Sequence, residues 1–361
     1  MKDDRQHLQL FDLIARAWMA PAAVDHIVFN ASQTAVAFGC ADGTVAIAAT
    51  ADKSSPDARI RRAADTAQLS IQPRNGSYPG LKLADHTEGR SSAVRPYGPD
   101  NFLFAKASGR INTVSPGGTS VHLPPKASGA ISAADAVTGD KALAYAVDAT
   151  VHLWTPDAAF AVDLPAPVST LRYSPDGLTL AIGYDGGVLL WSANAEATVP
   201  LPGCPVAVVW SGDGRSMACC LAKDGLAVID LATRACTLRG NFPAPVTSAG
   251  FGHLQDKVAA SGAFRVAAWA LDGAAFTTGK SGLVLVDAVA TSPNRNLVAV
   301  GYANGLLSLA EIGRADEILL RQDTGIGISA LTWSANGRFL GVGGPDGTAA
   351  LIEFPDSMFK S

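Results

Sequence analysis

One stretch of the sequence has residue types and an order that could bind a phosphate group. Residues 274–281 read AAFTTGKS, so Lys280 and Ser281 follow a glycine as they do in phosphate-binding loops. Such a loop places its lysine and hydroxyl at the start of a helix, whose N–H groups and dipole face the anion. The residues that follow, Gly282 and then LVLVDAVA, are typical of a strand. We therefore expect residues 274–281 to form a loop that binds no nucleotide.

A second glycine pattern and the histidines give no better candidate for catalysis. A strand-like run also follows the Gly-x-Gly-x-x-Ala pattern of Gly325, Gly327 and Ala330, where a dinucleotide site would need a helix. The six histidines are scattered along the chain, and no Gly-x-Ser-x-Gly elbow accompanies them. Asp85 and His86 could meet a serine in space, but their spacing alone does not predict a triad. We expect no catalytic residues and no cofactor.

The cysteines and the recurring aspartates could in principle hold a metal ion. Four of the five cysteines lie close together in the sequence, at Cys204, Cys219, Cys220 and Cys236. Cys219 and Cys220 are neighbours on an expected strand, so their side chains point to opposite faces and cannot both bind one ion. We expect them to be buried thiols that pack as small apolar side chains.

Aspartates recur in short turns, at Asp42, Asp148, Asp185, Asp224 and Asp346. A ring of carboxylates on one face would suggest a cation site. Aspartate, however, also tolerates the left-handed backbone region and accepts hydrogen bonds from its own turn. Turn formation explains these residues, and we expect no metal site.

These residues are set in a repeated pattern of short strands. Val168 to Trp191 reads VSTLRYSPDGLTLAIGYDGGVLLW, which is three apolar runs separated by two turns. Asp185-Gly186 supplies the positive φ that a tight hairpin needs. Three short strands bury too little surface to be stable alone, so this unit must stack on copies of itself.

Copies of the unit extend along most of the chain. The second hairpin turn recurs at Asp42-Gly43, Ser108-Gly109, Asp148-Ala149, Asp185-Gly186, Asp224-Gly225, Gly262-Ala263, Asn304-Gly305 and Asp346-Gly347. From the second turn onward the spacing is between 37 and 42 positions, and only the first gap is longer. A period near 40 with several short strands predicts a β-propeller, an all-β ring of four-stranded antiparallel blades.

The repeats resemble those of the WD40 family. Ser174-Pro175-Asp176-Gly177 and Ser334-Ala335-Asn336-Gly337 resemble the first turn of that repeat, and Trp154, Trp191 and Trp269 stand where its third strand ends in tryptophan. The aspartate that normally follows the tryptophan is absent after all three, and so is the opening Gly-His pair. The resemblance implies that most blades lack the buried network which the histidine, the hairpin aspartate and a hydroxyl form in well-matched members.

The turn count favours eight blades in a single domain, residues 1–361. If the unit from Ala93 to Ser115 only elaborates the first blade, the ring would have seven. The last unit ends near Phe354 without a fourth strand, so we expect the N-terminal segment, residues 1–23, to close the ring with a strand near Leu8 to Leu13.

Residues 51–90 form an insertion between the first and second blades, with five arginines at Arg59, Arg61, Arg62, Arg74 and Arg90. It is too long for one edge strand and a loop. Part of it should complete the first blade and the rest should project from a rim, either as a solvated insertion or as a binding loop.

Charge and hydropathy exclude several classes of partner. The net charge is −4, which gives no reason to expect a nucleic-acid backbone as partner. No apolar run is long enough for a membrane span. Asp3, Asp4, Asp12 and Arg16 interrupt the apolar core that a secretory signal needs. We expect a cytoplasmic, monomeric propeller with reduced cysteines.

The resemblance implies a non-catalytic scaffold that binds another protein through loops on one face of the ring. Aromatic and arginine side chains that flank the turns or lie in the insertion are the expected anchors: Arg61, Arg62, Arg74, Tyr78, Tyr184, Lys223, Phe264, Arg265 and Tyr302. The alternative is a small ligand or metal in the central channel, possibly with enzymatic activity. Polar residues in or beside the innermost strands would serve it: Asp25, Arg95, Asp135, Arg172 and Asp287.

Overall fold

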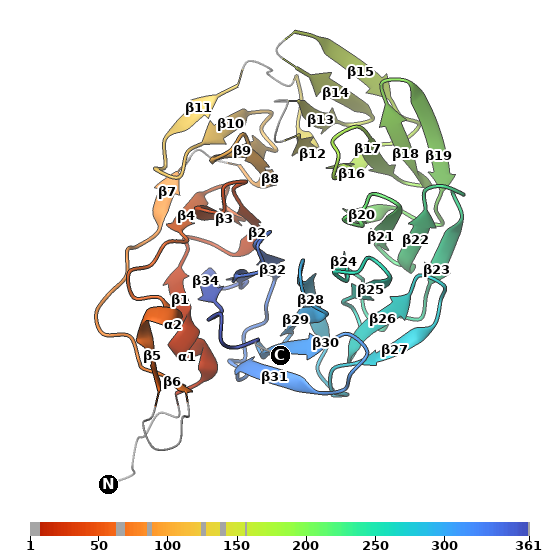
Figure 1. Cartoon of the computed structure of the whole chain (residues 1–361). Coiled ribbons are helices and arrows are strands. Elements are labelled where there is room, and N and C mark those ends of the chain that lie inside the picture. Colours follow the sequence, from red (N-terminus) through yellow and green to blue (C-terminus); the bar gives the residue numbers. More distant parts are fainter. Residues whose placement is uncertain are drawn as a thin grey trace.

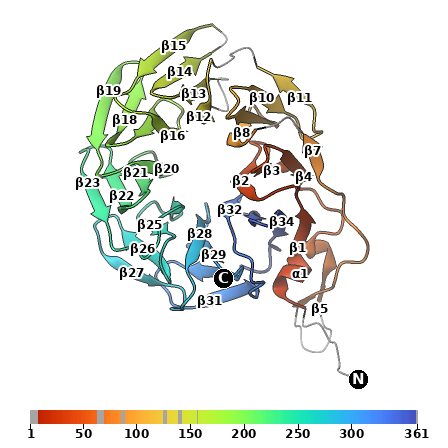
Figure 2. The ribbon, with the colours of Figure 1, turned by 180° about the vertical axis from the view of Figure 1, so that it is seen from behind.

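The protein is a ring of eight four-stranded antiparallel sheets around a central channel (Figures 1 and 2). The computed structural model describes residues 8–62, 69–84, 89–123, 128–137, 142–155 and 157–359. It confirms the all-β propeller with eight blades and an N-terminal closing strand. The seven-bladed alternative is wrong, because the unit around Ala93 to Ser115 forms a sheet of its own.

In each blade the first strand lines the channel and the fourth lies at the outer edge. Blades 1 to 4 contain β2 (Val24–Phe29), β3 (Ala35–Cys40), β4 (Val45–Ala49) and β7 (Lys82–Ala84); β8 (Ser91–Tyr97), β9 (Asn101–Lys106), β10 (Ile111–Val114) and β11 (Ser120–His122); β12 (Ile131–Ala136), β13 (Leu143–Val147), β14 (Thr150–Trp154) and β15 (Ala159–Asp163); and β16 (Val168–Tyr173), β17 (Leu180–Tyr184), β18 (Gly187–Ser192) and β19 (Ala195–Pro200).

Blades 5 to 8 repeat this order. They contain β20 (Pro205–Trp210), β21 (Ser216–Leu221), β22 (Gly225–Asp230) and β23 (Cys236–Arg239); β24 (Ala249–Phe251), β25 (Lys257–Ala260), β26 (Val266–Ala270) and β27 (Ala275–Thr278); β28 (Val286–Thr291), β29 (Leu297–Tyr302), β30 (Leu307–Glu311) and β31 (Glu317–Arg321); and β32 (Ala330–Trp333), β33 (Phe339–Gly343), β34 (Thr348–Glu353) and β1 (Ala15–Met19).

All eight predicted second turns connect the second and third strands of a blade, on one face of the ring that we call the turn face. The backbone explains their residue types. Gly43 and Gly186 have positive φ, and Asp148 has φ 54°. The Asp42 carboxylate accepts hydrogen bonds from both the Thr44 amide and the Thr44 hydroxyl, and Asp346 binds Thr348 in the same way. The recurring aspartates are therefore turn residues, as the sequence predicts.

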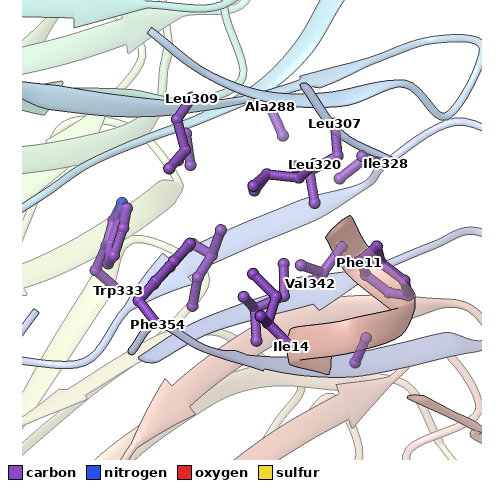
Figure 3. Packing of buried hydrophobic residues seen from close by; sticks show 14 residues of the cluster. Phe11, Ile14, Ala288, Leu307, Leu309, Leu320, Ile328, Trp333, Val342 and Phe354 are labelled. Carbon is purple, nitrogen blue, oxygen red and sulfur yellow. The ribbon is translucent and has the colours of Figure 1, made fainter. Parts of the chain in front are cut away.

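The hydrophobic core is divided into eight clusters, one between each pair of neighbouring blades. The second strands are accordingly buried on both faces, as in β3 and β21, whereas outer strands such as β15 and β23 are mostly exposed. Figure 3 shows the cluster between blades 7 and 8, where Leu309 and Trp333 come from the two sheets. Each blade thus depends on both neighbours for burial.

Glycines in the second strands mark where neighbouring blades approach most closely. Gly183, Gly301 and Gly343 occupy the same register position in blades 4, 7 and 8. A Cβ on Gly301 would lie 2.7 Å from Cγ2 of Ile328 in the next blade. A side chain there would push apart two sheets that pack against each other.

We predict that Gly301→Ala lowers the free energy of unfolding by about 1–3 kcal/mol, because the added methyl overpacks the interface between blades 7 and 8. The matched control is Gly240→Ala, since Gly240 has open space within 4 Å of its Cβ position. Chemical denaturation measures both. Equal stability of the two variants would contradict the close approach.

The ring closes where the two ends of the chain meet. β1 pairs with β34 over Ala15 to Met19, so the predicted N-terminal closing strand exists but lies C-terminal to the expected Leu8 to Leu13. Those residues largely form the short helix α1 (Leu10–Ile14). Phe11 and Ile14 are three positions apart, which places both on one helical face, and they pack into the cluster between blades 7 and 8 (Figure 3).

The insertion, residues 51–90, contributes to two parts of the structure. Its C-terminal part forms β7 and completes blade 1, as predicted. The rest lies outside the ring: α2 (Pro56–Arg59) and the hairpin of β5 (Ile60–Arg62) and β6 (Leu69–Ile71) lie beside α1 and β1, at the outer side of the closure (Figure 1). We call the described residues between 52 and 79 the brace.

Arginines join the brace to the closing segment. Arg59 is buried and donates hydrogen bonds to the carbonyls of Leu13 (2.6 Å) and Ser54 (3.0 Å). Arg74 forms an ion pair with Asp52, with an Nη1 to Oδ1 distance of 3.1 Å and both side chains nearly buried. The buried Arg16 of β1 lies 3.9 Å from the same carboxylate. Asp52 therefore compensates two arginines at the closure.

We predict that Asp52→Asn destabilises the fold by about 3–5 kcal/mol, because it leaves the nearly buried Arg74 without its ion-pair partner and removes one of the two carboxylates near Arg16. Asp256→Asn is the control, since Asp256 is half exposed in its pair with Lys257 and should change stability by less than about 1 kcal/mol. Thermal and urea unfolding measure the difference. A wild-type transition for Asp52→Asn would show that the brace does not hold the ring closed.

Candidate functional site

The structure divides the nine predicted anchors between the closure and the turn face. Arg61 and Arg62 are exposed on β5, as a binding role requires. The guanidinium group of Arg74 is engaged in its ion pair with Asp52. The Tyr78 hydroxyl donates to the Ala17 carbonyl (2.7 Å) and accepts from the Ala17 amide (3.0 Å), while its ring packs edge-on against Trp18. Arg74 and Tyr78 therefore serve the closure of the ring.

The tyrosines expected at the turn face are unavailable to a partner. Tyr184 and Tyr302 are buried in the interblade clusters, and the Tyr302 hydroxyl donates to Glu317 (2.8 Å). Their predicted exposure is wrong, because the last residue of a second strand still lies between two sheets. Lys223 and Phe264 are exposed beside their turns, and Arg265 is half-buried.

Two exposed hydrophobic residues join Phe264 on the turn face. Leu283 lies in the loop from β27 to β28 and is 96% exposed, and Ile326 lies in the loop from β31 to β32 and is 42% exposed, close to the 44% of Phe264. We call these three residues the apolar rim. Sequence reasoning missed Leu283 and Ile326, although each stands beside a glycine in a link between blades.

Backbone hydrogen bonds join the loops of the apolar rim in sequence around the ring. The Gly282 amide donates to the Phe264 carbonyl (3.4 Å), and the Ala303 amide donates to Leu285 (2.9 Å). The Gly325 amide then donates to Asn304 (2.9 Å). These contacts fix the loops of blades 6, 7 and 8 side by side.

A cavity of about 380 Å³ opens at the turn face beside these loops. Its wall is mostly apolar, with Pro245, Val286, Ile328 and Pro345, and it contains one carboxylate, Asp287. Burial raises the pKa of Asp287 above its usual range. An apolar hollow with one polar group suits an inserted side chain.

The channel is the second candidate. It forms a cavity of about 760 Å³ that touches the inner strands of blades 1, 2, 4, 6, 7 and 8. The sequence placed Asp25, Arg95, Asp135, Arg172 and Asp287 in or beside these strands. The structure brings Arg95, Asp135 and Arg172 together, pairs Asp25 with Arg90 at 3.2 Å, and places Asp287 at the separate cavity on the turn face.

The channel wall is held by contacts between blades. In six blades the first strand contains a register shift. The Ser169 hydroxyl, at the shift in blade 4, donates to the Pro205 carbonyl of blade 5 (2.6 Å). Ser329 of blade 8 likewise donates to the Val24 carbonyl of blade 1 (2.6 Å). The tryptophan indoles of Trp210 and Trp333 donate to the preceding blades. These bonds make the inner wall a rigid surface.

His26 faces the channel and was not singled out by its sequence position. Burial lowers its pKa from 6.5 to about 4, and the neighbouring positive charge of Arg95 adds to the shift while Asp25 opposes it. The imidazole is therefore neutral at pH 7 and adds no positive charge to the channel.

The other motifs considered in the sequence, the Gly-Lys-Ser run and the cysteines, are explained by their places in the fold. Lys280 lies in the loop after β27, where its amide donates to Glu317 (2.8 Å), and β28 follows it as the sequence predicts. Cys219 and Cys220 point into the clusters on opposite sides of blade 5, and burial raises the pKa of both thiols. Cys236, in contrast, is exposed. Asp85 and His86 lie outside the described residues.

Two further properties concern only the part of the chain that the structure describes. No group of three or more histidine, cysteine, aspartate or glutamate side chains there is arranged to hold a metal ion. The helices found in those residues are too short to cross a membrane.

Comparison with known protein families supports the resemblance in one blade. Residues 163–192 match the WD40 model, described as WD domain, G-beta repeat. The match begins at the end of β15 and continues to the end of β18 in blade 4. A comparison with curated proteins found no match.

We predict that His26 makes the protein less stable in acid. An imidazole whose pKa is lower in the folded state binds its proton first in the unfolded chain, so stability falls as the pH drops from about 6.5 to about 4. His26→Gln should remove up to about 3 kcal/mol of that loss. Denaturation at several pH values compares the two proteins, and parallel curves would contradict the prediction.

Proposed function

We propose that this protein is a non-catalytic interaction platform in the cytoplasm, a monomeric ring that binds another protein at its turn face. WD40 propellers are generally non-catalytic scaffolds that bind other proteins. The observation that carries the proposal is the apolar rim, because three large hydrophobic side chains are exposed on neighbouring loops of one face.

Two exposed leucines on the opposite face are arranged differently. On the opposite face, Leu178 and Leu254 are exposed on the first turns of blades 4 and 6, which are not neighbours. A single exposed leucine needs no explanation, whereas a group beside a hollow is typical of a protein-binding surface. Gly327, the neighbour of Ile326, lines the cavity, so a side chain inserted beside the rim would gain burial on several sides.

The rigidity of the ring favours binding at this place. Backbone hydrogen bonds hold the loops in position before a partner arrives, so little conformational entropy is lost on association. Lys223 is exposed beside the turn of blade 5 on the same face. We therefore propose a partner that binds the rim through an apolar anchor.

The test is a comparative affinity purification from the native host. We predict that a double variant, Phe264→Ser with Leu283→Ser, loses a partner that wild-type protein retains, because interface anchors typically contribute 2 kcal/mol or more, about thirtyfold in affinity. Both side chains are substantially exposed, so the fold should be unchanged.

Leu178→Ser with Leu254→Ser is the matched control on the opposite face and should retain the same partner. Mass spectrometry identifies the retained proteins, and circular dichroism verifies that both variants are folded. Retention of every partner by the rim variant would overturn the proposed binding face.

A further inference from the structure

Three consecutive blades place a charged residue at the same position of their innermost strands. Arg95 of β8, Asp135 of β12 and Arg172 of β16 occupy equivalent register positions opposite the second strand. We call these residues the channel triad. The other five blades carry uncharged residues at that position: Val28, Val209, Gly250, Ala290 and Thr332. At this register position the charge is therefore confined to blades 2, 3 and 4.

Both oxygens of the Asp135 carboxylate, the single carboxylate of the channel triad, already have partners. Asp135 Oδ1 accepts a hydrogen bond from Arg95 Nε (2.7 Å) and lies 3.5 Å from Arg172 Nη1, while Oδ2 accepts from the Tyr173 amide (2.6 Å). In the described chain, no other carboxylate forms an ion pair with either arginine. Two guanidinium groups and one carboxylate leave one positive charge without a counter-charge.

Burial makes this excess charge unfavourable. The side chains of Arg95 and Asp135 are 19% and 6% exposed. Desolvation lowers the pKa of Arg95, and the nearby positive charge of Arg172 lowers it further. An anion that contacts both guanidinium groups from the channel would relieve both effects, because it adds a charge-assisted hydrogen-bond partner.

The channel offers room and access for such an anion. Arg95 and Arg172 line one side of the cavity of about 760 Å³, and Arg172 is 44% exposed within it. Thr247, Ser248 and Thr332 line the same cavity from blades 6 and 8. The Ser248 hydroxyl accepts from the Val289 amide (2.9 Å), which leaves its proton available to donate. The volume is within the range of sites for small organic molecules.

We infer that the channel binds a small organic anion whose phosphate or carboxylate group contacts Arg95 and Arg172 from the channel side, and whose polar remainder reaches the hydroxyls opposite. The planar guanidinium groups suit an oxyanion with two adjacent oxygens. The anion site is separate from the apolar rim, so the proposal of anion binding and the proposal of protein binding can hold independently of each other.

The experiment measures binding of two probes by isothermal titration calorimetry and by thermal shift at constant ionic strength. Pyrophosphate represents a phosphate ligand and citrate represents a carboxylate ligand. We expect one of them to bind the wild-type protein saturably with one site and to raise its unfolding temperature. Which probe binds identifies the anionic group.

Arg172→Gln tests the site, because among the described residues the one ion pair of Arg172 is its 3.5 Å contact with Asp135, and its replacement should not unfold the protein. The dissociation constant should rise at least about tenfold, as expected for loss of a charge-assisted contact. Arg172→Lys keeps the charge without the planar donor pair and should give an intermediate value.

Arg215→Gln is the matched control. It removes the same charge from a side chain that is 87% exposed on the first turn of blade 5, and it should bind the probe like wild type. Three results would overturn the inference: no saturable binding of either probe to the wild-type protein, unchanged affinity in Arg172→Gln, or equal weakening in Arg215→Gln.

Discussion

The structure depends on closure of the ring, because no blade can bury its hydrophobic surface alone. Each of the eight core clusters takes its residues from two neighbouring sheets, so an open ring would expose the surfaces on both sides of the gap. The chain crosses all eight of these junctions, the last of them through the link from β1 of blade 8 to β2 of blade 1. In the eighth blade, β1 must return from the N-terminus and pair with β34 without a covalent link to it.

The arginine-rich insertion is best understood from this constraint. Arg59 and Tyr78 contact the closing segment, Arg74 pairs with Asp52 beside Arg16, and Asp57 pairs with Arg338 of blade 8 at 3.0 Å. The hydrogen bonds go mainly to backbone carbonyls, which suits guanidinium groups with several donors. An insertion that leaves blade 1 thus contributes to holding blade 8. Arg61 and Arg62 are the part of it that remains exposed.

A closed ring also separates two kinds of surface. The turn face presents hydrophobic side chains on loops that hydrogen bonds fix in place, whereas the channel contains buried charge on one side and hydroxyls on the other. Apolar exposure favours a macromolecular partner, and enclosed excess charge favours a small anion. The two proposals therefore rest on different physical properties of the same scaffold, and the repeated architecture allows both because each blade can vary one position independently.

The sequence by itself determined the blades, because turn residues and strand periodicity are local properties. Asp148, Gly186 and their equivalents adopt positive φ because the tight turn formed with their sequence neighbours requires it. The opposite orientations of Cys219 and Cys220 follow from the alternation of side chains along one strand. Only the tertiary structure decided which of the candidate side chains are exposed and free to bind a partner. Tyr184 is covered by an adjacent blade, Tyr78 is bound to β1, and Arg95 and Arg172 both contact Asp135 of the blade between them. These contacts join residues distant in sequence, and the packing of whole sheets sets them.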